Sequence, residues 1–161
     1  MSFQTHRSPR NAGFDSVRIL LVEDEARVRN VMKEVLEMQG FLVVECETAE
    51  QALLQSTASL SRFDVLLTDA MLPGKTGRQL ARDLRQRIPA LKTILVSGYG
   101  EAQALLGAEK NDKVSYLPKP FSASSLVAAV QRVTENAGTL SAKRANPSTS
   151  PQERQTARHP A

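Results

Sequence analysis

The sequence has no tryptophan, a single cysteine and few aromatic side chains, which make up 4% of its 161 residues. Because Cys46 is alone, no disulfide can form within the chain, and this suits a reducing compartment. No apolar run approaches the roughly 20 residues that a membrane-spanning helix needs. The first residues, MSFQTHRSPRNAG, also lack the apolar stretch of a secretory signal. We therefore expect a cytoplasmic protein that has no membrane partner and a core of Leu, Val, Ile and Ala.

The formal net charge of +4 raises the question of a nucleic-acid partner. Residues 15–136 hold 15 lysines and arginines against 16 acidic residues, so the basic surplus lies in the two ends of the chain. Both ends are rich in polar residues and show no periodic apolar pattern, which is typical of disorder. The sequence therefore predicts a disordered tail over 1–15, a disordered basic tail rich in Ser and Pro over 137–161, and no nucleic-acid partner. A DNA-binding role for the tails is the weaker hypothesis, and a salt dependence that vanishes without 137–161 would favour it.

Between the tails, short apolar runs alternate with helical patterns. The expected strands cover 17–22, 41–46, 64–68, 92–97 and 113–117. The expected helices cover 26–38, 48–60, 76–87 and 101–106, with a last helix after Ser122. Two of the helices begin with capping boxes, Thr48 with Gln51 and Thr76 with Gln79. Five such βα units without a hairpin signal predict an α/β fold, a doubly wound five-stranded parallel sheet with helices on both faces.

Polar side chains follow four of the five strands. Glu23 and Asp24 come after the first strand, Asp69 after the third, Ser97 at the end of the fourth and Lys119 after the fifth. Ligands of such sheets bind outside the carboxyl ends of the strands, so we expect these groups to converge there. Clustered carboxylates need a cation among them, and oxygen ligands favour Mg²⁺ where phosphate is involved. A carboxylate beside that ion can attack phosphorus, while an ammonium and a hydroxyl bind phosphoryl oxygens.

Each of these residues also has an ordinary explanation when it is taken alone. An acid at a helix N-terminus is favoured by the helix dipole, and an aspartate before MLPG can begin a turn. Ser97 can belong to a turn and Lys119 can be a solvated lysine. Their joint placement at the strand ends is what favours phosphoryl chemistry.

Four separated motifs carry a resemblance to a known family: LLVEDE, VLLTDAMLPGKTG, TILVSGYG and YLPKPF. The chain resembles the receiver domain of two-component response regulators over 16–136. The resemblance implies a flavodoxin-like (βα)5 fold with strand order 2-1-3-4-5. It implies a phosphoacceptor rather than an enzyme, which takes a phosphoryl group from a histidine kinase or a histidine phosphotransfer protein and then changes its binding to an unknown downstream protein.

The resemblance also assigns roles to single residues. Asp69 matches the phosphoacceptor. Glu23 and Asp24 match the acidic pair that holds Mg²⁺, or Mn²⁺ as a substitute, together with Asp69 and the backbone carbonyl of Met71. Ser97 and Tyr116 match the switch hydroxyl and the switch aromatic. Lys119 matches the phosphate-binding lysine, and the Lys119–Pro120 bond is the candidate cis peptide.

The spacing in SGYGEAQALLGAEKNDKVSYLPKPF is most similar to that of receivers in hybrid sensor kinases. Residues after 136 are too few and too polar for an output domain, so the resemblance implies a stand-alone receiver. Two alternatives stay open. One is an interaction module that works without phosphorylation. The other is a phosphatase of the haloacid dehalogenase type, which needs a second acid two residues after the nucleophile, where this chain has Met71.

Overall fold

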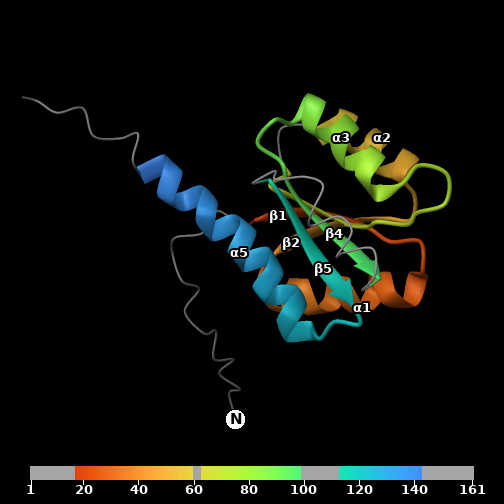
Figure 1. Cartoon of the computed structure of the whole chain (residues 1–161), viewed down its shortest axis with the longest axis horizontal. Coiled ribbons are helices and arrows are strands. Elements are labelled where there is room, and N and C mark those ends of the chain that lie inside the picture. Colours follow the sequence, from red (N-terminus) through yellow and green to blue (C-terminus); the bar gives the residue numbers. More distant parts are fainter. Residues whose placement is uncertain (1–16, 60–62, 99–112, 143–161) are drawn as a thin grey trace, which may run out of the picture.

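A computed structural model describes residues 17–59, 63–98 and 113–142 of the chain. Its centre is a sheet of five parallel strands in the order β2-β1-β3-β4-β5. Figure 1 shows the strands running through the molecule with helices packed around them. The predicted fold class, the parallel pairing and the strand order are confirmed.

The strands and helices follow the predicted alternation closely. The strands are β1 (Arg18–Val22), β2 (Leu42–Cys46), β3 (Val65–Asp69), β4 (Lys92–Gly98) and β5 (Val114–Lys119). The helices are α1 (Ala26–Met38), α2 (Ala49–Ser59), α3 (Gly77–Arg87) and α5 (Ala123–Ala142). The strands β3, β4 and β5 each run one or two residues further than the apolar pattern indicated, because they continue into the polar residues at their carboxyl ends.

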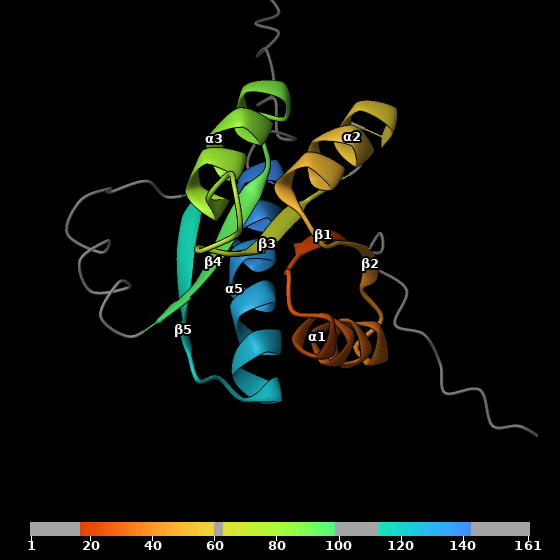
Figure 2. The same ribbon diagram turned by 90° about the vertical axis from the view of Figure 1, so that its right-hand side faces the viewer.

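Two layers of apolar side chains cover the two faces of the sheet. On one face, Ile19 and Leu21 of β1 pack with Leu36 of α1 and Val130 of α5. On the other face, Leu20 of β1 belongs to a second cluster with residues of α2 and α3. Figure 2 shows this arrangement, with α2 and α3 on one side of the sheet and α1 and α5 on the other. Since both faces are covered, β3 at the centre is buried along its whole length.

The helix ends show how local sequence sets these boundaries. Thr76 and Gln79 form the complete capping box that the sequence predicted for α3. At α2, the Thr48 hydroxyl accepts a hydrogen bond from the Gln51 amide at 3.2 Å. The Gln51 side chain, however, accepts a hydrogen bond from the backbone N–H of Glu47 rather than from that of Thr48.

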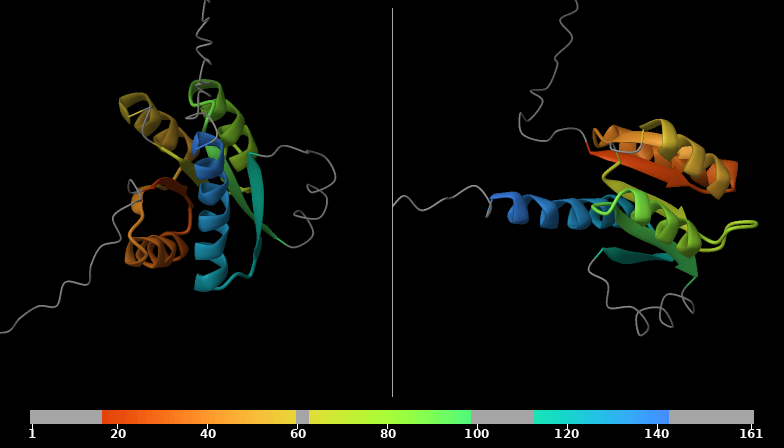
Figure 3. Two further views of the ribbon diagram at one scale, coloured as in Figure 1. Left: turned by 90° about the vertical axis from the view of Figure 1, so that its left-hand side faces the viewer. Right: turned by 90° about the horizontal axis from the view of Figure 1, so that it is seen from above.

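The helix α5 continues to Ala142, beyond the predicted domain end at 136. Residues 137–142 are thus helical, whereas the sequence predicted a disordered tail from residue 137 onward. Ala137, Leu140 and Ala142 favour a helix, and the segment follows a helix already stabilised by packing on the sheet. Figure 3 shows the carboxyl end of α5 projecting past the sheet.

Some of the predicted segments belong to parts of the chain that the structure does not describe. The helix expected over 101–106, the tail expected over 1–15 and residues 143–161 of the tail expected over 137–161 lie outside the described residues. In the part of the chain that the structure describes, no helix combines the length and apolarity needed to cross a membrane.

Candidate functional site

The carboxyl ends of the parallel strands bring polar side chains to one edge of the sheet. Glu23 follows β1, Asp69 ends β3, Ser97 lies near the end of β4 and Lys119 ends β5. Asp69 pairs with Val96 in the sheet register, so Ser97 follows directly after the residue beside it. Glu23, Asp69 and Ser97 are buried, at 2%, 8% and 1% exposure. The edge is therefore a polar site whose innermost side chains are buried, and four strands contribute to it.

Three carboxylates form a cluster in this site. Glu23, Asp24 and Asp69 each offer an oxygen, and these oxygens all lie within 4.8 Å of one another. Burial raises the pKa of Glu23 more than any other cause. Lys119 and the Glu25 amide act in the opposite direction, while the charges of Asp69 and Asp24 raise it further. The raised pKa of Glu23 shows that its negative charge is incompletely compensated by the surrounding protein.

The donor set fits a small hard cation. The Glu23 carboxylate accepts a hydrogen bond from the Glu25 amide through Oε1 at 3.2 Å. Its other oxygen, Oε2, is buried, accepts no hydrogen bond from any residue that the structure describes, and lies 3.8 Å from Lys119 Nζ. A buried oxygen without a donor carries a large desolvation cost, which a bound cation would offset. Three carboxylates with such an oxygen suit Mg²⁺, which takes oxygen ligands.

Lys119 joins the end of β5 to the carboxylates. Its ammonium donates a hydrogen bond to Asp69 Oδ2, and the Lys119–Pro120 peptide bond is cis. Burial disfavours the ammonium, but the hydrogen bond to Asp69 and the charges of Glu23, Asp69 and Asp24 outweigh this effect, so the pKa of Lys119 is raised. Lys119 is therefore a firmly charged group aimed at the Asp69 carboxylate.

Ser97 carries an unused hydroxyl. Its Oγ is buried and makes no hydrogen bond within the described part of the chain. A buried hydroxyl without a partner is uncommon in folded proteins, because it loses its bonds to water and gains none in return. The hydroxyl is consequently available to a ligand that enters beside Asp69.

Met71 and Tyr116 differ in how they relate to Asp69. The Met71 amide donates to Asp69 Oδ1 at 2.8 Å, which holds the backbone of residue 71 against the carboxylate. Tyr116 is half-buried on β5, and its hydroxyl accepts a hydrogen bond from Arg78 Nη2 at 3.2 Å. No described hydrogen bond joins Tyr116 to Asp69. The structure thus gathers the carboxylates, Lys119 and Ser97, and it links Tyr116 to α3.

Sequence reasoning missed three residues that shape the site. Arg29 of α1 donates to the backbone carbonyl of Glu23, Gly77 packs on the backbone of Asp69, and Arg78 contacts Tyr116. A glycine at the first position of α3 was a usable signal, because glycine is a poor helix former. The two arginines gave no signal, since surface arginines are common on helices.

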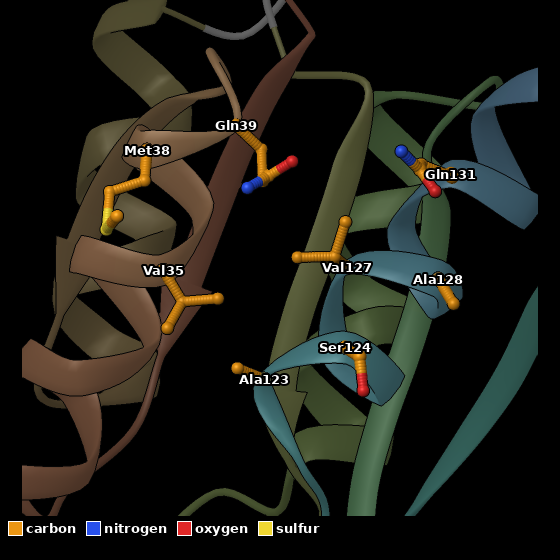
Figure 4. Close-up of a pocket in the computed structure, with 8 residues that line it drawn as sticks. All are labelled: Val35, Met38, Gln39, Ala123, Ser124, Val127, Ala128 and Gln131. Atoms are coloured by element: carbon orange, nitrogen blue, oxygen red, sulfur yellow. The ribbon is translucent and has the colours of Figure 1, made fainter.

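A separate groove of about 380 Å³ lies between α1 and α5. Figure 4 shows Val35 and Met38 of α1 on one side of it and Ala123 and Val127 of α5 on the other. None of the carboxylates, Ser97 or Lys119 lines this groove. The groove is therefore distinct from the polar edge of the sheet.

The sequence of the chain is similar to that of a known domain family and of several bacterial signalling proteins. The family model for the response regulator receiver domain matches residues 19–131. The chain is 34% identical over 120 residues to the sensor kinase CckA of Brucella abortus, a match that covers 74% of this chain and 13% of that protein. It is 37% identical over 116 residues to the transcriptional regulatory protein CpxR of Escherichia coli, covering 72% of this chain and 48% of CpxR. The matched region thus spans less than half the length of these relatives.

Crystal structures of isolated receivers match over almost their whole length. A receiver domain protein from Clostridium thermocellum has a TM-score of 0.70 and 26% identity, and the match covers 77% of this chain and 98% of that one. The receiver domain of the hybrid histidine kinase CckA has a TM-score of 0.62 and 31% identity, covering 72% and 97%. Sequence, fold and site agree, and the chain belongs to the response regulator receiver family of two-component signalling.

Proposed function

We propose that this receiver is a Mg²⁺-dependent phosphoacceptor and that Asp69 is the residue that takes the phosphoryl group. Receivers as a family accept phosphoryl groups and interact with histidine kinases or phosphotransfer proteins. The observation that carries the proposal is the convergence of Asp69 with Lys119, Ser97 and the Glu23–Asp24 pair at one edge of the sheet. Two buried polar atoms there, Glu23 Oε2 and Ser97 Oγ, have no hydrogen-bond partner among the described residues.

The cation would be held by the carboxylates of Glu23, Asp24 and Asp69 and by the backbone carbonyl of Met71, and Mn²⁺ would serve as a substitute. When bound, the ion supplies positive charge to the phosphoryl oxygens. Glu23 and Asp69 are buried while Asp24 is exposed, so Asp24 lies where the site opens to solvent. The Met71 amide already holds Asp69 Oδ1, which orients the carboxylate for the incoming group.

In the reaction, a carboxylate oxygen of Asp69 attacks the phosphorus of a phosphohistidine. The new O–P bond forms as the P–N bond breaks, and the electron pair of that bond stays on the imidazole nitrogen. Lys119 already donates to Asp69, so its ammonium needs little movement to bind a phosphoryl oxygen. The Ser97 hydroxyl donates to another of these oxygens.

The acyl phosphate then changes the balance between two arrangements of the same residues. Lys119 and Ser97 turn toward the phosphoryl oxygens, and Tyr116 follows by leaving the position in which Arg78 holds its hydroxyl. The output is a changed surface around β5 that binds a downstream protein in one state better than in the other.

The phosphatase alternative requires a general acid two residues after the nucleophile. That residue is Met71, whose thioether transfers no proton, and its side chain is 63% exposed. An interaction module that works without phosphorylation would have no use for three clustered carboxylates and a buried Glu23 oxygen that accepts no hydrogen bond from the described residues. Both features favour the phosphoacceptor.

The test is phosphorylation by a small donor. The full chain is incubated with phosphoramidate and Mg²⁺, and the intact mass is measured. We expect the addition of one phosphoryl group, its loss when EDTA is present, and no addition in Asp69→Asn. A wild-type chain without the adduct, or an Asp69→Asn chain that retains it, would contradict the proposal.

A further inference from the structure

Arg29 connects α1 to the backbone of the acidic loop, which is the segment 23–25 between β1 and α1. It lies in the first turn of α1, and its Nη1 donates to the carbonyl of Glu23 at 2.6 Å and reaches the carbonyl of Asp24 at 3.4 Å. Its side chain is only 14% exposed. One guanidinium nitrogen thus contacts the backbone of both residues whose carboxylates form the cluster with Asp69.

The charge of Arg29 is compensated on the side away from the cluster. Glu45 of the edge strand β2 has Oε2 at 3.6 Å from Arg29 Nε. The same carboxylate accepts a hydrogen bond from Lys33, one turn further along α1, at 2.9 Å. Glu45 therefore draws the guanidinium toward β2, while Nη1 remains bonded to the acidic loop.

The acidic loop needs such a restraint because repulsion between its carboxylates and Asp69 works against their close approach. Glu23, Asp24 and Asp69 repel one another while no cation is bound, and this repulsion favours a loop that opens. The residue that begins α1, Glu25, makes no side-chain capping bond that would fasten this end of the helix. Backbone bonds from the amide of Glu23 to Cys46 and from the amide of Arg29 to Glu25 hold parts of the loop. Arg29 adds a charged donor on the carbonyls themselves.

We propose that Arg29 is a positioning residue of the cation site: it holds the backbone of Glu23 and Asp24 so that their carboxylates face Asp69 before the cation arrives. This inference rests on the proposed function, because it assumes that the carboxylate cluster binds Mg²⁺. Outer-shell groups that orient metal ligands usually change metal affinity by 10–100-fold when they are removed.

A positioning role of Arg29 and a purely electrostatic role predict opposite changes in Mg²⁺ affinity, so one variant distinguishes them. Arg29→Met removes a positive charge near the site, so an effect of charge alone would tighten Mg²⁺ binding. Loss of positioning would weaken it. Lys33→Met is the matched control, because it removes the other cation of the Glu45 group from the same helix and has no described contact with the acidic loop.

The dissociation constant for Mg²⁺ is measured by calorimetry on the full cation-free chain, with circular dichroism to verify folding. We expect it to rise about tenfold in Arg29→Met and to stay unchanged in Lys33→Met. Arg29→Lys keeps the positive charge but only one donating nitrogen, and its dissociation constant should fall between those of the wild type and Arg29→Met. Should the methionine variant fail to fold, Arg29→Gln gives the same test, since its amide is too short to reach both carbonyls. The Mg²⁺ concentration for half-maximal phosphorylation by phosphoramidate should rise in parallel.

The outcomes separate this inference from the function on which it rests. A wild-type chain that binds no Mg²⁺ would overturn the cation site and the role of Arg29 together. A wild-type chain that binds Mg²⁺, with unchanged or tighter binding in Arg29→Met, would overturn the role of Arg29 alone. Equal weakening in Arg29→Met and Lys33→Met would also overturn it, because the effect would then come from α1 as a whole.

Discussion

Gly77 lies directly against the backbone of Asp69. A β-carbon on residue 77 would be 2.1 Å from the Asp69 carbonyl oxygen and 3.0 Å from its carbonyl carbon. The Gly77 amide also donates to the carbonyl of Ala70 at 3.1 Å. The first residue of α3 is thereby packed onto the end of β3, and only a residue without a side chain allows this approach.

Gly77→Ala should therefore displace α3 from the site. The neighbours of the added methyl group are backbone atoms, which cannot rotate away, so we expect a loss of about 1–3 kcal/mol in the free energy of unfolding, measured in urea. Phosphorylation of Asp69 by phosphoramidate should slow as well, because the carboxylate shifts with its backbone. Gly98→Ala is the matched control, since a β-carbon at residue 98 meets nothing within 4 Å. Equal stability of the two variants would contradict the packing argument.

Removal of the ammonium should separate cation binding from switching. Lys119→Met removes a positive charge from beside Asp69 and Glu23, so Mg²⁺ should bind about tenfold more tightly. The free energy of this tenfold change is well below the unscreened Coulomb energy of two unit charges at the same distance. Phosphorylation should persist, while the change at Tyr116 that accompanies it should be lost. Calorimetry with Mg²⁺ and the ring resonances of Tyr116, recorded by NMR with and without phosphorylation, measure the two effects.

Two results would contradict this role of Lys119. One is unchanged Mg²⁺ affinity, which would mean that the ammonium does not neutralise the carboxylates. The other is a normal shift of the Tyr116 resonances on phosphorylation in Lys119→Met. Lys113→Met, at the opposite end of β5, is a control for the loss of one positive charge.

The hydrogen bond between Arg78 and Tyr116 should appear as a coupling energy. In a double-mutant cycle of Arg78→Met and Tyr116→Phe, we expect a coupling of about 1 kcal/mol in the free energy of unfolding. Arg82→Met, one turn further along α3, should show no coupling with Tyr116→Phe. If Tyr116 moves on phosphorylation, the coupling should decrease in the phosphorylated protein. A cycle with no coupling in the unphosphorylated protein would mean that the contact contributes nothing.

The thiol of Cys46 should be unreactive in the folded protein. Burial raises its pKa to about 11, an effect only partly opposed by the charge of Arg29. Relative to a thiol with a pKa of 9.0 the thiolate fraction falls about 100-fold, so alkylation by iodoacetamide at pH 8 should be slower by at least this factor than in urea. Because the folded pKa is the higher one, the thiol contributes stability that is complete below the unfolded pKa and is lost as the pH rises to about 11. Rapid alkylation of the folded chain, measured by mass spectrometry, would contradict the burial.

Much of the fold was accessible from the sequence because the periodicity of apolar residues is a local signal. Alternating apolar runs and helical stripes located every described strand and helix, and the Thr76–Gln79 box located the start of α3. The end of α5 was missed, because the chain is helical through a segment whose composition alone resembles a tail. Composition does not register that a long helix already packed on the sheet extends easily by a further turn.

The polar residues at the strand ends were also accessible, since a parallel sheet brings its carboxyl ends together. The contacts of Arg29, Gly77 and Arg78 were not, because each depends on how two separate elements pack. The distance between Arg78 and Tyr116, 38 positions apart in the chain, is set by the packing of α3 on β3 and β4 and has no sequence period. Local patterns thus predict which groups are present, and tertiary packing decides how they are held.

Glu23 and Lys119 of the site are far apart in the sequence, since Glu23 follows the first strand and Lys119 closes the last. Asp69 alone, on the central strand, is therefore only one part of the site. A chain in which β5 has detached still carries Asp69 but presents it without Lys119 and Tyr116. A partly folded receiver that accepted a phosphoryl group would consequently have no means of passing the change on.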